Sequence, residues 1–202
     1  MTEKLLHDAM ILWATIDPIG TLVIFFALTR RLEPKARRKV AIKSVFYAAL
    51  VLLSAVVIGE ILLDKMGIHL VSLKLSGGII LFLFGLQMIF GDESITNKER
   101  EAGHDIAVFP LAIPSIASPG AILAAILLTD NHQYSIIEQA KTAGVISAIL
   151  LITLVLMLAA TPIFKVIGHN GASILIRVMG MILTALSVEF IMQALHIPQW
   201  VA

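Results

Sequence analysis

Asp17-Pro18-Ile19-Gly20 interrupts one apolar stretch of the chain, and Ser118-Pro119-Gly120 interrupts another. Proline lacks the N–H that a helix interior needs, its ring clashes with the preceding turn, and it disfavours α geometry in the residue before it. Aspartate and serine are good N-cap residues, and proline is favoured at the first position of a helix. We therefore predict that each stretch consists of two half-helices, the second beginning at the proline.

The apolar stretches are long enough to cross a membrane, which takes about 20 helical residues. Of the 202 residues, 58% are hydrophobic and 14% are charged, whereas roughly a quarter are charged in soluble proteins. We predict an all-α integral membrane protein that forms a single membrane domain over residues 1–202. Its six expected spans are residues 5–28, 40–63, 71–90, 106–129, 142–164 and 172–195.

The two interrupted spans match each other along the chain, and residues 74–80 match residues 177–183 in the same way. We predict two three-helix repeats, residues 1–91 and 106–202, joined by a cytoplasmic linker at 92–105. Because three is odd, the second repeat must enter the membrane from the opposite face. The predicted architecture is an inverted pair in which the first and fourth helices are broken near the midplane, an arrangement typical of secondary transporters.

Charge predicts the orientation of the chain. Most of the 15 lysine and arginine residues fall in or next to the first, third and fifth connections. By the positive-inside rule these connections are cytoplasmic, and both termini lie on the other side. The net charge of +1 and the aromatic content of 6% argue against a nucleic-acid partner. Membrane lipid is the expected surrounding.

The breaks are the predicted substrate site. A half-helix that begins at the midplane directs free N–H groups and a positive dipole end into the site, which suits a carboxylate. We expect residues 118–121 to receive that carboxylate, and Asp17 or the carbonyls of Ile16 and Ala117 to receive an ammonium group. Asp17 is also the candidate for coupling to H⁺ or Na⁺, although an aspartate N-cap alone explains its presence. The candidate binding residues are Asp17, Pro18, Gly20, Thr21, Ser118, Pro119, Gly120 and Ala121.

Other polar or small residues within the spans are secondary candidates: Ser76, Gly77, Gly78, Gln87 and Glu189. We favour a structural role for them, because small residues allow close helix packing and long polar side chains reach the interface. The six histidines fall near helix ends without metal-ligand spacing, so we assign no metal and expect no cofactor. The chain has no cysteine, which excludes disulfides and thiolate chemistry.

Several stretches together resemble the MarC family of multi-pass inner-membrane proteins, which includes SnatA-type transporters of small neutral amino acids. They are Asp17-Pro18-Ile19-Gly20, residues 76–83, residues 110–114, Ala117-Ser118-Pro119-Gly120 and residues 177–180. The resemblance implies a six-span inner-membrane protein and, through the SnatA branch, amino-acid transport. One departure is Ser118, where similar members often have glycine.

We therefore expect a secondary transporter of small neutral amino acids or similar zwitterions, working by alternating access. No nucleotide-binding loop is present, so a gradient must supply the energy. The alternatives are a channel, a regulatory or scaffold protein, or an exporter of small drugs. We expect no enzyme activity, because Asp17 alone does not make a convergent catalytic set.

Overall fold

The computed structural model describes residues 2–91 and 105–195, and every regular element in these ranges is helical. Five helical segments are long and apolar enough to cross a membrane, or six if the bent pair η1 and α6 is counted as one span. All but Asp105 of the predicted linker lies outside the described residues. The elements are α1 (Thr2–Ile16), α2 (Pro18–Thr29), α3 (Pro34–Met66), α4 (Leu70–Phe90), η1 (Ala107–Ile116), α6 (Pro119–Leu127), α7 (Ile136–Leu158) and α8 (Ala160–Ala194).

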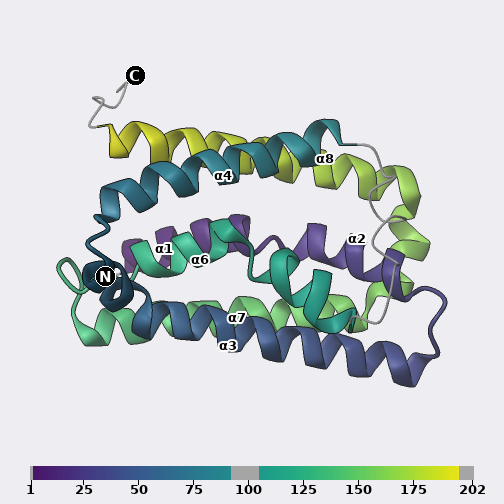
Figure 1. Cartoon of the computed structure of the whole chain (residues 1–202). Coiled ribbons are helices and arrows are strands. Elements are labelled where there is room, and N and C mark those ends of the chain that lie inside the picture. Colours follow the sequence, from purple (N-terminus) through teal and green to yellow (C-terminus); the bar gives the residue numbers. More distant parts are fainter. Residues whose placement is uncertain (1, 92–104, 196–202) are drawn as a thin grey trace.

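The helices form three layers (Figure 1). One outer layer is the pair α4 and α8, the other is the pair α3 and α7, and the short elements α1, α2, η1 and α6 lie between them. The paired outer helices run in opposite directions, as do α1–α2 and η1–α6. The four short elements are thus covered from two sides.

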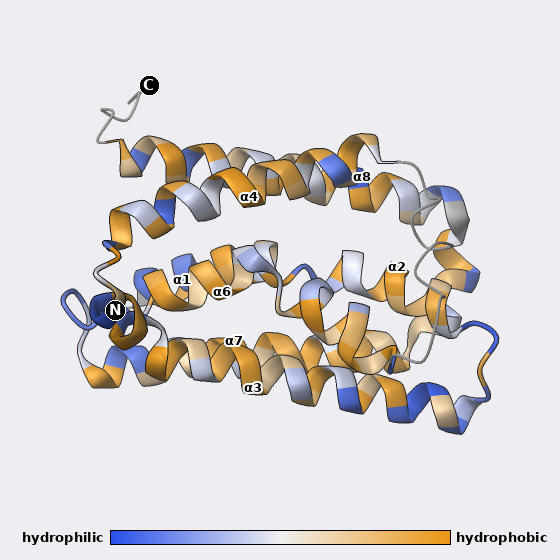
Figure 2. Cartoon of the chain, in the orientation of Figure 1, coloured by the Kyte–Doolittle hydropathy of each residue, from blue (hydrophilic) through white to orange (hydrophobic). Residues whose placement is uncertain are grey.

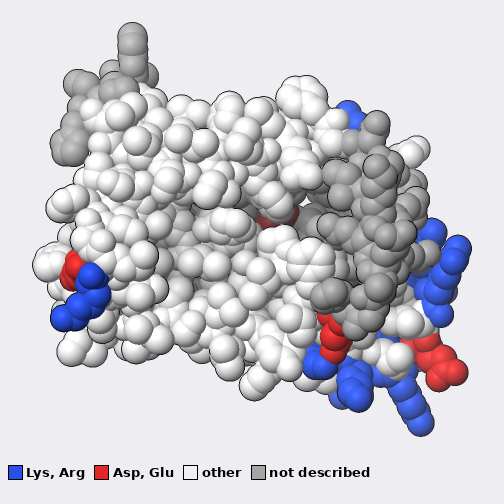
Figure 3. All heavy atoms as spheres, viewed as in Figure 1, with Lys and Arg blue, Asp and Glu red and all other residues white. Residues whose placement is uncertain are grey.

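Polarity is distributed as a bilayer requires. Apolar residues run along the length of the helices, and hydrophilic residues gather at the two ends of the bundle (Figure 2). In the space-filling view the face between the ends is almost free of charge, and the end with the α2–α3 connection carries most of the visible lysine and arginine (Figure 3). Large apolar side chains such as Phe46 and Val57 are exposed along the helices, which suits contact with lipid.

The first half of the fourth predicted span differs from the regular half-helix that we expected. The segment η1 has π-type hydrogen bonding, and Phe109 (φ −127°, ψ 126°) and Ile113 (φ −133°, ψ 124°) are extended within it. Each precedes a proline, Pro110 or Pro114, which pushes its predecessor out of α geometry and removes a helical N–H donor. The chain then bends by 52° between η1 and α6.

The boundaries of the last two spans also differ from the prediction. Helix α7 begins at Ile136 because Ser135 forms a capping box with Glu138, and it ends at Leu158. Helix α8 starts at Ala160 and contains a non-helical residue, Gly168, whose φ of 68° is favourable only for glycine. The apolar span within it covers Asn170–Ala194.

Close backbone approach defines the α4–α8 pair, the most extensive contact between two helices in the described chain. A Cβ atom placed on Gly85 would lie 2.4 Å from Thr184 Oγ1 and 3.0 Å from the Gly180 carbonyl oxygen. A Cβ on Gly180 would lie 2.9 Å from the Gly85 carbonyl oxygen. The two glycines therefore let the helix backbones touch, as small residues do in membrane helix pairs.

We predict that Gly85→Val destabilises the protein by about 1–3 kcal/mol, because the added side chain must push α8 away from α4. The matched control is Gly144→Ala on α7, where a Cβ would meet no atom within 4 Å. Thermal unfolding in detergent should show a lower Tm for Gly85→Val and no loss for Gly144→Ala. Equal Tm values for the two variants would contradict the close approach.

Candidate functional site

The first break is centred on Asp17, which separates α1 from α2. Its backbone is left-handed (φ 47°, ψ 72°), and its Oδ1 accepts a hydrogen bond of 3.0 Å from the Gly20 N–H. Aspartate is one of the few residues that tolerates this conformation, since its short side chain bonds to local backbone. A Cβ on Gly20 would lie 2.1 Å from Asp17 Oδ2, so any larger residue at position 20 would have to displace the carboxylate that makes the cap.

The second break is centred on Ser118, which separates η1 from α6. Ser118 is extended (φ −67°, ψ 157°), and its hydroxyl oxygen accepts a hydrogen bond of 3.0 Å from the Ala121 N–H. The two breaks thus share one design: a polar N-cap, a proline at the first helical position, and a side chain that accepts from the N–H three residues on.

Two polar contacts join the breaks directly. The Ser118 hydroxyl donates a hydrogen bond of 2.8 Å to the Thr15 carbonyl oxygen, two residues before Asp17. The hydroxyl oxygens of Thr21 and Ser115 lie 3.1 Å apart, and either can donate. Residues about 100 positions apart in the sequence therefore form one polar centre.

This centre is buried. The residues Thr21 and Ser118 are each 1% exposed, and Asp17 is 5% exposed. Within residues 2–91 and 105–195, Asp17 makes no ion pair with a lysine, arginine or histidine. In the space-filling view an acidic side chain is visible at the bottom of a hollow in the otherwise uncharged face (Figure 3). A buried carboxylate without a cationic partner can accept a proton or a small cation.

The structure places most of the predicted substrate residues at this centre. Pro18, Gly20, Gly120 and Ala121 are buried beside the two caps, whereas Pro119 is exposed. Ile16 and Ala117, whose backbone carbonyl groups are predicted partners of the ammonium group, are fully buried.

The secondary candidates lie on the α4–α8 layer. A Cβ on Gly77 would meet Leu123 of α6, and one on Gly78 would meet α8, so both glycines serve close packing. Ser76 and Gln87 are exposed. The remaining candidate, Glu189, accepts a hydrogen bond of 2.7 Å from Gln193.

Polar contacts tie the middle layer to the outer layers at both ends. At the end with the N-terminus, Asp8 is 2% exposed, and its Oδ2 accepts hydrogen bonds of 2.7 Å from Lys4 Nζ and from the Thr142 hydroxyl on α7. At the basic end, Arg37 donates to the Thr29 carbonyl oxygen (3.1 Å) and to the Thr161 hydroxyl.

An aromatic stack and an ion pair complete the basic end. The rings of Phe26 and Phe164 stack with their centroids 4.0 Å apart. The Lys43 ammonium forms an ion pair with Asp105 and, with the Ala107 N–H, holds the pKa of that carboxyl group below its usual value. Polar and aromatic contacts thus connect the layers at both ends of the bundle, on either side of the buried centre.

Some of these residues were not identified from the sequence. Asp8 could have been identified, because it is an acidic residue inside an apolar span and Lys4 lies one turn before it. Ser115 carries no comparable signal, because a single serine beside a proline is common in membrane helices. Its role depends on a contact that only the folded chain reveals.

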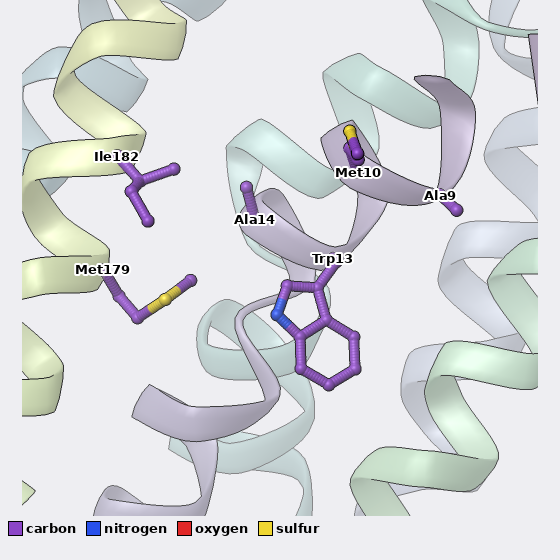
Figure 4. Close-up of a pocket in the computed structure, with 6 residues that line it drawn as sticks. All are labelled: Ala9, Met10, Trp13, Ala14, Met179 and Ile182. Atoms are coloured by element: carbon purple, nitrogen blue, oxygen red, sulfur yellow. The ribbon is translucent and has the colours of Figure 1, made fainter. Parts of the chain in front are cut away.

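A separate groove opens between α1 and α8. It has a volume of about 350 Å³ and an entirely apolar set of lining residues: Ala9, Met10, Trp13, Ala14, Met179 and Ile182. Figure 4 shows the Trp13 and Met179 side chains directed into the space between the two helices. The groove offers no charged group to a zwitterion, and its lining suits apolar groups.

Several apolar membrane-length helices around a buried polar centre define a multi-pass integral membrane protein. The sequence profile of the MarC family of integral membrane proteins matches residues 2–197, and the chain belongs to this family. The resemblance found in the sequence motifs is thereby confirmed.

Relatives match over nearly the whole chain. A membrane protein of Archaeoglobus fulgidus is 35% identical, covering 91% of this chain and 88% of its own. A membrane protein of Methanocaldococcus jannaschii is 37% identical, covering 92% of each chain. The inner membrane protein YhgN of Escherichia coli is 32% identical, covering 96% of this chain and 97% of its own. No solved structure matches the chain.

We predict that Ser118→Ala lowers the free energy of unfolding by about 1–3 kcal/mol, because it removes the cap of α6 and leaves the Thr15 carbonyl oxygen without its partner. The control is Ser147→Ala, whose hydroxyl bonds only the Ala143 carbonyl of its own helix at 2.9 Å. That change should stay within about 0.5 kcal/mol. Unfolding in mixed detergent and SDS micelles measures both, and equal losses would contradict the joined-break description.

Proposed function

We propose that this protein is a secondary transporter of small neutral amino acids or similar small zwitterions. The observation that supports the proposal is the pair of capped helix breaks that meet in one buried polar centre. Interrupted helices that face each other across a bundle are a common way to build a substrate site inside a membrane.

The chemistry of the centre suits a zwitterion. Helix α6 presents the positive end of its dipole there, and the Ser118 hydroxyl occupies the acceptor position that a carboxylate oxygen would take from the Ala121 N–H. The Asp17 carboxylate supplies a negative charge for the ammonium group or for a coupling ion, H⁺ or Na⁺.

Alternating access follows if the chain is an inverted repeat. Each element of residues 1–91 runs opposite to its counterpart in the second half, and the outer helices pair counterpart with counterpart, α3 with α7 and α4 with α8. We infer that the two halves move against each other, and that the contacts of Asp8 and of Arg37 are the two gates. An ATP-driven or enzymatic role is not part of the proposal.

The proposed setting is the inner membrane, as the name of the Escherichia coli relative suggests. With the basic end on the cytoplasmic side, both termini face outward.

An exporter of apolar drugs is the second candidate, and the α1–α8 groove favours it. Methionine and tryptophan side chains adapt to apolar ligands of varied shape, and both line this groove. Its ligands would differ in chemistry from those of the buried centre.

Uptake into proteoliposomes tests the proposal. We expect saturable uptake of labelled glycine, alanine, serine or threonine that depends on an imposed H⁺ or Na⁺ gradient. Non-saturating flux would indicate a channel. Transport of a lipophilic cation without any flux of amino acids would indicate a drug exporter. No flux of any solute would support a scaffold role and overturn the transporter proposal.

We predict that Asp17→Asn separates binding from coupling. The amide oxygen still accepts from the Gly20 N–H, so the cap and the fold remain, but the charge that holds H⁺ or Na⁺ is lost. Exchange of labelled for unlabelled substrate should persist, while gradient-driven accumulation falls to the level of protein-free liposomes. The control Glu33→Gln makes the same charge change at an exposed helix start that has no side-chain cap bond. Unchanged accumulation by Asp17→Asn would remove the coupling role.

A further inference from the structure

Three potential metal ligands from distant parts of the sequence meet at the end of the bundle that carries the N-terminus. The carboxylates Glu60 and Asp64 are one turn apart on α3, so they share a face of that helix. The imidazole of His132 comes from the loop between α6 and α7. One ligand atom from each of the three lies within 4.8 Å of the other two.

The Glu60 carboxylate is the unusual member, because it is buried and only half satisfied. Its Oε2 accepts a hydrogen bond of 2.5 Å from the Asn131 N–H. Its Oε1 is buried without a hydrogen-bond partner, and the side chain is 6% exposed. A buried carboxylate oxygen without a partner is unfavourable, and a cation is the partner that removes the penalty.

The position of His132 points to the same cation. Its Nε2 lies 3.2 Å from Glu60 Oε1, which is an ion-pair distance when the imidazole is protonated, although that oxygen accepts no hydrogen bond. Ligands of a tetrahedral zinc ion, with bonds of about 2.1 Å, lie about 3.4 Å apart. Glu60 Oε1 and His132 Nε2, 3.2 Å apart, are already close to this spacing. Asp64 and His132 are exposed and can rotate to complete the set.

The loop that carries His132 is itself well ordered by hydrogen bonds. Asp130 Oδ1 accepts from the His132 N–H at 2.8 Å, and Asp130 Oδ2 accepts from the Gln133 side chain at 2.7 Å. The Gln139 side chain donates to Asn131 Oδ1 at 2.8 Å. The loop therefore holds the histidine backbone in place beside α3, as supporting contacts do around metal ligands.

We propose that Glu60, Asp64 and His132 form a binding site for a divalent transition-metal ion of the zinc class. One imidazole with two carboxylates suits Zn²⁺ and its neighbours, whereas Mg²⁺ and Ca²⁺ prefer oxygen-only sets with more ligands. A bound ion joins α3 to the loop that directly follows α6. It therefore fixes the C-terminal end of α6 to the α3–α7 layer of the bundle. No sequence pattern indicates this site, because the histidine is 68 or more residues away from both carboxylates.

Metal binding to the purified full-length protein tests the proposal, with an affinity tag that contains no histidine. Zn²⁺ affinity is measured by competition with a chromophoric chelator, and Co²⁺ is added as a spectroscopic probe of tetrahedral nitrogen and oxygen coordination. We expect one ion per chain. His132→Ala and Glu60→Gln should each weaken binding by about tenfold or more. The control His69→Ala removes another exposed histidine and should leave binding unchanged.

Thermal unfolding separates a lost ligand from a lost fold. The His132 side chain is 74% exposed, so His132→Ala should unfold at the same temperature as the parent protein without metal. Zn²⁺ should raise the Tm of the parent and of His69→Ala but not that of His132→Ala. Equal Zn²⁺ affinity of His132→Ala and His69→Ala, or no Zn²⁺ bound by the parent protein, would overturn the proposal. Neither result depends on transport, so the transporter proposal stands or falls separately.

Discussion

A helix interrupted within a bilayer must satisfy its own backbone groups, because lipid offers no hydrogen-bond partner. This constraint explains the centre of the structure. Asp17 and Ser118 each cap the half-helix that follows, and the Ser118 hydroxyl also reaches the Thr15 carbonyl oxygen across the break. Two interruptions that would be unfavourable in lipid are thus stable when they face each other between two protein layers.

The three-layer arrangement follows from the same requirement. The pairs α4–α8 and α3–α7 cover the short elements from both sides, and close contact at Gly85 and Gly180 lets one of these pairs form a tight layer. Charges are confined to the ends of the bundle. Under the transporter proposal, substrate reaches the centre when the contacts at one end open, and alternating access requires that the two ends open in turn.

Local chemistry predicts the two capped helix starts, at Pro18 and at Pro119, but it does not predict the long-range contacts between them. A cap followed by proline acts within a few residues, so Asp17 and Ser118 could be identified as helix starts from the sequence. The extended residues Phe109 and Ile113 in η1 also follow a local rule, because each precedes a proline. The contact of Thr21 with Ser115 depends on the packing of elements about 90 residues apart, and no local pattern encodes it.

Alternating access requires that the two breaks move relative to each other during function. The chain has no cysteine, so Thr21→Cys with Ser115→Cys introduces a single pair at side chains whose oxygens lie 3.1 Å apart. Oxidation should form a disulfide that stops amino-acid uptake by proteoliposomes, reduction should restore uptake, and each single variant should be insensitive to oxidant. Undiminished uptake by fully cross-linked protein would contradict this requirement.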